Sequence, residues 1–356
     1  MDAYRHIPCH LFHANEPRAS FDVGPVRFFS RMAWAEEFLV EDAVRANVLQ
    51  AWEEGSRWSP DEALSVPDKT KVETVLRAIG HHGWIGSVLV QGHDAESSHA
   101  KANVLVDLAI DSLNVMLPPS DGILLNRAGV AFFPGGVRLA TTTQGTIVAG
   151  SSARLPGLGG HPDRFKEFLA ETADFRQAAG HVLASYAEAH QDGLDAAWLI
   201  ERWVNALHWF GGARREDSDF MAVVKYGCAL DILSGAGGNL REMTEYVEAT
   251  FGITEATDQS GRTVMLEDLL NSLFNDGRSA LAHGESFGLL NDRSTDRARA
   301  DVIVRQLIES GATPLGQAVR DKDRILSVDK DSQMRAFKVR LRGLSRERAG
   351  KSPPAE

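Results

Sequence analysis

The sequence predicts an α+β protein, because its two halves differ in the spacing of their apolar residues. The first 150 residues mix short apolar runs of strand length with helical periodicity, whereas the chain after residue 160 repeats apolar side chains mostly at helical spacing. A chain of 356 residues is also long enough for two domains. We therefore expect a mixed α/β domain (1–150), a linker (151–160), a mostly helical domain (161–333) and a basic, partly disordered tail (334–356).

The first domain is expected to contain a strand, a helix and then several short strands. WIGSVLVQG (84–92) is an apolar run of strand length that ends at a glycine, and AKANVLVDLAIDSLNVML (100–117) repeats apolar residues at helical spacing. Residues 122–150 alternate short runs of Thr, Val and Phe with glycine turns, as strands do. The stretch SSARLPGLGG (151–160) has no apolar periodicity, which makes it the expected linker.

The second domain is expected to be a helical bundle. Apolar residues at helical spacing, with a glycine at or near most ends, predict helices over 161–190, 194–213, 219–235, 239–252, 264–284 and 294–311. Helices of this length joined by short loops pack as bundles.

The net charge of −11 disfavours nonspecific binding of nucleic acid, because phosphate backbones repel such a surface unless basic residues gather in one place. They do gather near the end of the chain, where Glu347 is the only acidic neighbour of Arg335, Lys338, Arg340, Arg342, Arg346, Arg348 and Lys351. Two interpretations stay open for this stretch, a solvated tail and a nucleic-acid contact.

Nothing in the sequence predicts a membrane partner or export. No run approaches the roughly 20 apolar residues that span a bilayer, and the first residues, MDAYRHIPCHLFHANE, lack the basic start and apolar run of an export signal. The two cysteines, Cys9 and Cys228, lie too far apart in sequence to form a disulfide framework. We expect a cytoplasmic protein.

A group of potential zinc ligands near the N-terminus is considered and set aside. His6, Cys9, His10 and His13 lie close together, and imidazole and thiolate are the usual ligands of zinc. A structural zinc site needs a second ligand pair, however, and Cys228 is the only other cysteine. We therefore expect neither a metal nor another cofactor.

The motif most indicative of chemistry is NDGRSALAHGE (275–285), in which Arg278 and His283 stand five residues apart. The same separation occurs elsewhere, for example between Arg77 and His82, so the spacing alone does not identify a site. The context is more specific, because this pair closes a predicted bundle helix that has an apolar lead-in and a stopping glycine.

Together with WVNALHWFGGA (203–213) and CALDIL (228–233), this motif resembles the Apea-like branch of the helical HEPN domains, found in bacterial defence and stress proteins. The resemblance covers residues 195–290 and is weaker over 84–117. It implies a HEPN-like four-helix bundle that forms a homodimer. It also implies a metal-independent ribonuclease with an RNA substrate, of the antiviral-defence or abortive-infection kind, restrained or triggered by a partner.

The resemblance also assigns residues to the site. Arg278 and His283 take the catalytic positions, and Ser279 takes the position after the arginine, where many members have asparagine. Asp231 stands where an acidic residue often precedes the motif. The first domain would then have a sensing or regulatory role.

The chemistry is plausible on physical grounds as well. RNA carries its own nucleophile, the 2′-hydroxyl, so cleavage needs a group that moves protons and a cation that stabilises the phosphate. Five residues on one helix place Arg278 and His283 about 140° apart, so one helix cannot direct both at one phosphate. Two copies meeting at a symmetric interface can. At the helix end, the macrodipole favours the imidazolium form of His283, which suits a general acid or phosphate clamp.

Two alternatives remain open. In the first, the two residues have only structural roles: Arg278 pairs with Asp276 or Asp231, and His283 caps the C-terminus of its helix. The bundle would instead mediate dimerisation or bind a ligand or partner in a non-catalytic regulatory protein. The aromatic side chains of the 195–215 stretch are expected in the core, and His208 is expected to be an interior, hydrogen-bonded histidine.

Overall fold

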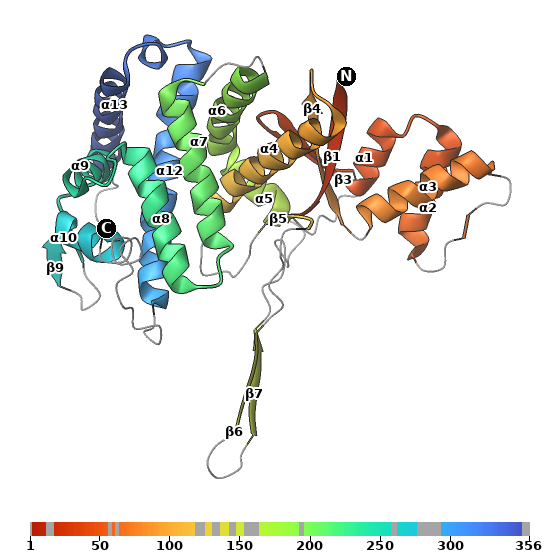
Figure 1. The fold of residues 1–356 in the computed structure, drawn as a ribbon, viewed down its shortest axis with the longest axis horizontal. Helices are drawn as coiled ribbons and strands as arrows, with labels where there is room; N and C mark the ends of the chain where they lie inside the picture. Colours follow the sequence, from red (N-terminus) through yellow and green to blue (C-terminus); the bar gives the residue numbers. More distant parts are fainter. Residues whose placement is uncertain are drawn as a thin grey trace. The chain divides into compact units, whose positions relative to one another are not determined.

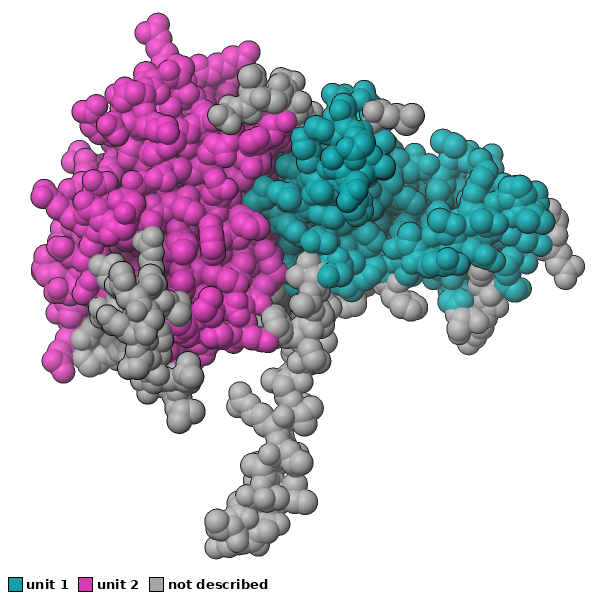
Figure 2. Space-filling view, viewed as in Figure 1, with its two compact units in different colours: residues 1–110, 122–171 teal, residues 111–121, 172–356 magenta. Residues whose placement is uncertain are grey.

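The computed structural model describes two compact units, which Figure 2 draws in teal and magenta. Unit 1 comprises residues 1–110 and 122–171, and unit 2 comprises residues 111–121 and 172–356. The description covers residues 2–11, 18–55, 59–60, 64–80, 82–117, 125–129, 136–141, 147–152, 164–191, 196–257, 262–275 and 293–350.

Unit 1 is built on an antiparallel sheet of five strands in the order β2-β3-β4-β1-β5 (Figure 1). The strands are β1 (Ala3–His10), β2 (Ser20–Val23), β3 (Val26–Ser30), β4 (Trp84–Val90) and β5 (Asn126–Arg127). The predicted strand at 84–92 is β4, which pairs with β1 on one side and β3 on the other. Its central place explains why nearly all of its side chains are buried.

Helices α1 (Arg31–Phe38), α2 (Asp42–Glu54) and α3 (Val66–Ile79) belong to unit 1. Helix α4 (Ala95–Val115) belongs to it as far as Ile110. The first three lie between β3 and β4 in the chain, and Ser30 and Ser65 cap the starts of α1 and α3 by accepting backbone N–H groups. Val44, Val48 and Val72 form the buried contact between α2 and α3.

The remaining elements of unit 1 follow α4. The strands β6 (Gly136–Thr141) and β7 (Ile147–Ser152) pair as an antiparallel two-stranded sheet, in agreement with the predicted short strands. β7 includes the first two residues of the expected linker 151–160, and the others lie outside the described residues. Helix α5 (Arg164–Glu171) completes the unit.

Unit 2 is mostly helical, which together with the sheet of unit 1 confirms the α+β class. Its helices are α6 (Ala173–Gln191), α7 (Trp198–Arg214), α8 (Asp219–Ser234), α9 (Leu240–Phe251), α10 (Leu266–Leu270), α12 (Ser294–Arg320) and α13 (Lys330–Gly350). Its short elements are β8 (Glu255–Thr257), β9 (Thr263–Met265), a π-helical turn (Asn271–Asn275) and a 3-10 turn (Arg324–Leu326). The long helix α12 packs against α6, α7 and α8 (Figure 1). Among the helices of the described residues, none has the length and apolar content needed to cross a bilayer.

The boundary between the units differs from the predicted one at both sides. Composition places α5 in the helical domain, but Phe165 packs against Trp84 in unit 1, with ring centroids 5.2 Å apart. Residues 111–121 belong to unit 2, where Asp111 pairs with Arg215. Both differences come from contacts between residues far apart in sequence, which a change of composition does not reveal.

Helix α12 continues beyond Gly311, where the sequence predicts its end, and runs to Arg320. Gly311 lies against the Trp203 ring, and a Cβ at Gly316 would lie 2.5 Å from the backbone oxygen of Ala178. These glycines therefore allow close helix packing and do not terminate the helix.

The expected basic tail is also a helix over most of its length. Residues 334–350 belong to α13, which buries Met334, Phe337 and Leu341 against unit 2. Their spacing of three and four residues is that of one helix face. The tail expected to be partly disordered is thus helical over residues 334–350, and residues 351–356 lie outside the described part.

Candidate functional site

The predicted catalytic residues Arg278 and His283, and the neighbouring Ser279, lie outside the described residues. The structure does describe the segment that leads to them. Leu270, Leu273 and Phe274 are buried, and a Cβ at Gly227 on α8 would lie 3.2 Å from the Phe274 ring. The apolar lead-in predicted for the motif therefore packs into the helical unit as far as Phe274.

Asp231, the fourth predicted site residue, lies at the end of α8 and holds the turn to α9. Its side chain accepts the N–H of Gly238 at 2.7 Å, and its backbone oxygen accepts the N–H groups of Gly235 and Ala236. Its charge also acts on the guanidinium of Arg202. This arrangement explains the glycine-rich sequence between the helices, because Gly235, Gly237 and Gly238 all have positive φ.

A buried polar cluster joins three helices of unit 2 where α7 ends. The Tyr226 hydroxyl donates to Asp301 Oδ1 at 2.5 Å, and Arg214 Nε lies 3.6 Å from the same oxygen. All three side chains are buried, and they come from α8, α12 and α7 respectively. Burial, followed by the charge of Asp301, raises the pKa of Tyr226, so the phenol stays protonated.

Two arginines of this region, Arg214 and Arg297, also donate to backbone oxygens of unit 2. Arg214 Nη1 donates to the backbone oxygens of Asn114 and Leu117, at 3.0 and 2.8 Å. Arg297 donates to Asp219 at 2.9 Å and to the backbone oxygen of Glu216 at 2.7 Å. The second arginine thus lies at the C-terminal end of α7, where exposed carbonyl groups favour a cation.

The charges of this cluster are matched within the protein. Four cations pair with four anions: Arg214 with Asp301, Arg215 with Asp111, Arg297 with Asp219, and Lys225 with Glu216. A cation whose charge is compensated by a neighbouring carboxylate attracts a further anion only weakly. We therefore assign the cluster to fixing the helices and not to binding a phosphate.

Sequence reasoning missed this cluster, although a signal was present. Asp301 lies at the same helical face as Val304 and Ile308, three and seven residues on, which are buried. An acidic residue within an apolar face predicts a buried partner of opposite charge or a hydrogen-bond donor. The identity of the partners, from α7 and α8, does not follow from the sequence.

The aromatic segment of α7 divides between core and surface. Trp203 and Phe210 are buried as predicted, and Trp203 Nε1 donates to the backbone oxygen of Ile308 at 3.0 Å. Trp209 is 39% exposed, and His208 is exposed as well. The prediction of an interior His208 is therefore wrong, since it lies on the outer side of a helix whose other side is buried.

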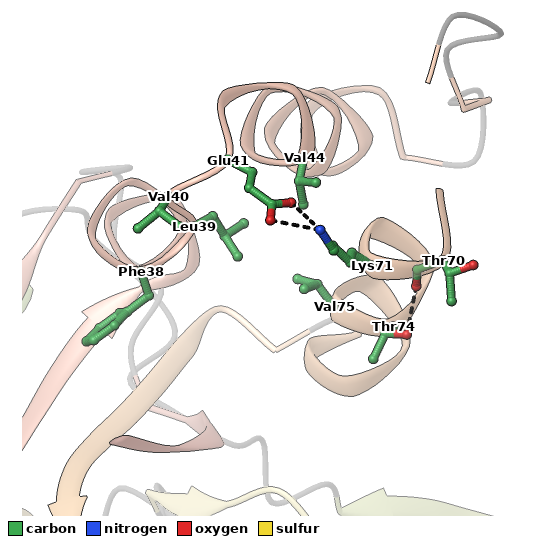
Figure 3. A pocket seen from close by; sticks show the side chains of 9 residues that line it. All are labelled: Phe38, Leu39, Val40, Glu41, Val44, Thr70, Lys71, Thr74 and Val75. Atoms are coloured by element: carbon green, nitrogen blue, oxygen red, sulfur yellow. Dashed lines mark hydrogen bonds and ion pairs between the residues drawn. The ribbon is translucent and has the colours of Figure 1, made fainter. Parts of the chain in front are cut away.

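Unit 1 contains a pocket of about 370 Å³ between the end of α1 and helix α3 (Figure 3). Its lining residues are Phe38, Leu39, Val40, Glu41, Val44, Thr70, Lys71, Thr74 and Val75. At the rim, Lys71 Nζ donates to both oxygens of Glu41, at 2.6 and 2.8 Å. Thr70 and Thr74 donate their hydroxyl hydrogens to backbone oxygens one turn earlier. The rim therefore mainly offers acceptors above an apolar floor.

Of the N-terminal group, Cys9 and His6 lie on opposite sides of the sheet, and His13 lies outside the described residues. Cys9 is buried and donates to the backbone oxygen of Ile7, and burial raises its pKa to about 12. His6 lies on the opposite face of β1, because alternate residues of a strand point to opposite sides. There Trp34 Nε1 donates to His6 Nδ1 at 3.0 Å. Among the described residues, no three His, Cys, Asp or Glu side chains converge as metal ligands would.

Comparisons with protein-family models, with curated proteins and with solved structures found no match to this chain.

Proposed function

We propose that this protein is a metal-independent endoribonuclease of HEPN type, acting as a bacterial defence or toxin-like effector. The observation that carries the proposal is the Arg278 and His283 pair, which follows an apolar lead-in buried in a helical unit. The packing of α12 against α6, α7 and α8 is compatible with the bundle that the resemblance implies. Arg278 and His283 act from two copies of the chain that meet at one cleft.

The proposed reaction needs only groups that the RNA and the protein supply. The 2′-hydroxyl oxygen attacks the adjacent phosphorus, the bond from phosphorus to the 5′-oxygen breaks, and a cyclic phosphate and a 5′-hydroxyl result. Arg278 binds the phosphate oxygens through its planar donors, because a guanidinium matches them in geometry and keeps its charge. His283 of one copy protonates the leaving 5′-oxygen, and His283 of the other copy accepts the proton that the 2′-hydroxyl loses.

The test is cleavage of a mixed RNA pool by purified protein in EDTA. We expect wild type to cut, and Arg278→Ala and His283→Ala each to lose at least a hundredfold of the rate, which is the usual effect of removing an acid-base or charge-stabilising group. Arg77→Ala combined with His82→Ala is the matched control, because this pair has the same separation in unit 1.

The control should cut like wild type, and light scattering should give the mass of a dimer for all variants. Equal rates in wild type and both motif variants would refute the assignment. Cleavage by wild type that occurs only when EDTA is left out would refute the metal-independent mechanism. Expression of the same variants in cells should reproduce the order as toxicity.

The pocket in unit 1 favours a second candidate, a non-catalytic regulatory protein whose bundle dimerises while unit 1 binds a ligand. Its volume of about 370 Å³ and apolar floor are within the range of small-molecule sites. The acceptors at the rim suit a ligand with an apolar body and a hydrogen-bond donor. Under this function the motif variants leave both dimerisation and ligand binding unchanged, and no RNA is cut.

A further inference from the structure

Helix α13 carries a row of exposed residues on the side away from the bundle. Arg335, Val339, Arg342 and Arg346 are all exposed, and at about 100° per residue they lie within about 60° of one another around the helix. The opposite side of α13 buries Met334, Phe337 and Leu341. In Figure 1, α13 is the dark blue helix beside α9. We call the three arginines of this row, Arg335, Arg342 and Arg346, the arginine stripe.

Three other basic residues of α13, Lys338, Arg340 and Arg348, are used within unit 2. Lys338 pairs with Glu245 of α9 at 3.5 Å, and Arg340 pairs with Asp323 at 2.5 Å. Arg348 donates to the hydroxyl of Ser310 on α12 at 3.0 Å. These contacts lie to the sides of the row or toward the bundle, so they anchor the helix and leave the stripe outside.

The stripe is less occupied. Among the described residues, Arg335 donates to the backbone oxygen of Asp331 and the hydroxyl of Ser332, both at 3.3 Å, and its charge also acts on Asp329. Arg342 and Arg346 have no hydrogen bond or ion pair with the part of the chain that the structure describes. Within the described ranges these two exposed guanidinium groups thus lack an acidic partner, although the net charge of the chain is −11.

We propose that the arginine stripe binds the phosphate backbone of single-stranded RNA, which rests on the proposed function because it gives the nuclease a grip on its substrate. From Arg335 to Arg346 the helix rises about 16 Å, enough to follow several nucleotides. A guanidinium group can donate two parallel hydrogen bonds to two oxygens of one phosphate. An otherwise acidic surface repels a polyanion, so affinity depends on the place where basic residues are concentrated.

Charge and shape favour RNA over an anionic membrane. A helix that lies on a membrane inserts an apolar face. The apolar face of α13 is packed in unit 2, and Val339 is the single apolar side chain within the row. A polyanion that needs only exposed charges is therefore the better match.

The experiment measures binding separately from cleavage. Full-length His283→Ala protein is titrated into a fluorescent single-stranded RNA that carries 2′-O-methyl groups, so that no strand is cut. Arg342→Glu with Arg346→Glu is compared with the control Arg241→Glu on the adjacent helix α9, where Arg241 is 82% exposed and pairs with Glu245. The double variant should weaken binding at least tenfold, and the control should change it less than twofold.

The salt dependence gives a second readout. Loss of two phosphate contacts should reduce the slope of log K against log salt by about 1.4, because each contact to a single strand contributes about 0.7. Absence of RNA binding in the parent protein, or equal binding by the double variant, would overturn the proposal. Preferential binding to vesicles containing phosphatidylserine over RNA would also overturn it, in favour of a membrane contact.

Cleavage assays distinguish this result from failure of the nuclease. In the chain with His283 intact, the double variant should raise KM at least fivefold and leave kcat within a factor of two. If RNA bound through the arginine stripe but was not cleaved, the binding proposal would stand and the proposed nuclease activity would be refuted. Circular dichroism checks that both variants keep their helices.

Discussion

At the scale of single residues, two neighbouring glycines of α7 have different roles. A Cβ at Gly211 would lie 1.9 Å from Oδ2 of Asp111, whose carboxylate is fully buried and paired with Arg215. At Gly212 the nearest atom to such a Cβ is Cδ of Lys225, at 3.9 Å. The same helix therefore needs glycine at one position and accepts a side chain at the next.

We expect Gly211→Ala to lower the free energy of unfolding by about 3 kcal/mol, because the added methyl group displaces a buried ion pair. Gly212→Ala should leave stability unchanged or raise it by up to about 1 kcal/mol, through the better helix propensity of alanine. Urea unfolding followed by circular dichroism measures both. Equal midpoints for the two variants would show that Asp111 moves aside without cost.

The second prediction at this scale concerns pH and His6. Burial, and secondarily the charge of Arg5, lowers the pKa of His6 from 6.5 to about 4. The hydrogen bond that His6 Nδ1 accepts from Trp34 also lowers this pKa, because a proton on that nitrogen would face the indole N–H. The unfolded chain therefore binds a proton between pH 6.5 and 4 that the folded chain does not.

Stability that is present above pH 6.5 should be lost as the pH falls toward 4, with no further loss from this group below that value. His6→Asn keeps an acceptor for Trp34 and removes the titration, so its stability should depend less on pH over this interval. His10 keeps part of the dependence, since burial lowers its pKa too. Urea midpoints measured from pH 7.5 to 4 test this, and identical slopes for both proteins would contradict it.

Residue identities of the polar cluster illustrate how far the sequence can predict a site. An acid on an apolar helix face, such as Asp301, indicates a buried partner, but not that the partner is Tyr226 with Arg214 nearby. Those pairings depend on the packing of three helices, which residue spacing does not specify. The motif pair Arg278 and His283 remains a prediction, as both lie outside the described residues.

At the scale of elements, α13 provides the clearest test of packing. Phe337 is 4% exposed and Val339 is 64% exposed, although they are two residues apart on the same helix. Phe337→Ala should lower the free energy of unfolding by about 3–5 kcal/mol, the usual effect of truncating a buried aromatic side chain. Val339→Ala should change it by less than about 0.5 kcal/mol.

Thermal or urea unfolding of the full chain measures this pair. If both variants were as stable as wild type, the helix would not be docked on unit 2 as described. The sequence alone does not predict that this segment is a packed helix. The charge of the segment indicates a solvated tail, whereas Met334, Phe337 and Leu341 carry the weaker signal of a helix face.

Other elements differ in how well periodicity predicts them. Helices α7, α8 and α9 and strand β4 lie close to the predicted ranges, because each has a long apolar pattern and a clear end. The end of α12 is mispredicted, since a glycine used for close packing has the same identity as one that ends a helix. The strands β1–β3 were not separable from the mixed pattern around them, because short half-buried strands have few diagnostic positions.

At the scale of the whole molecule, the sequence predicts the α+β class but not the course of the chain. The class follows from the change in apolar spacing between the two halves. The allocation of α5 to unit 1 and of residues 111–121 to unit 2 follows from partners distant in sequence, such as Trp84 for Phe165. The proposed function rests on one short motif and a family resemblance. The cleavage experiment is therefore its main test.

The discontinuity of both units has a consequence for inheritance. The chain passes from one unit to the other after residues 110, 121 and 171. A recombination event that exchanged everything before residue 172 would replace Asp111 by the residue of another protein. Arg215, which would not be exchanged, would then have to pair with that residue. The two units are therefore expected to change together through descent, and shuffling either one as an independent module would require three junctions to be matched at once.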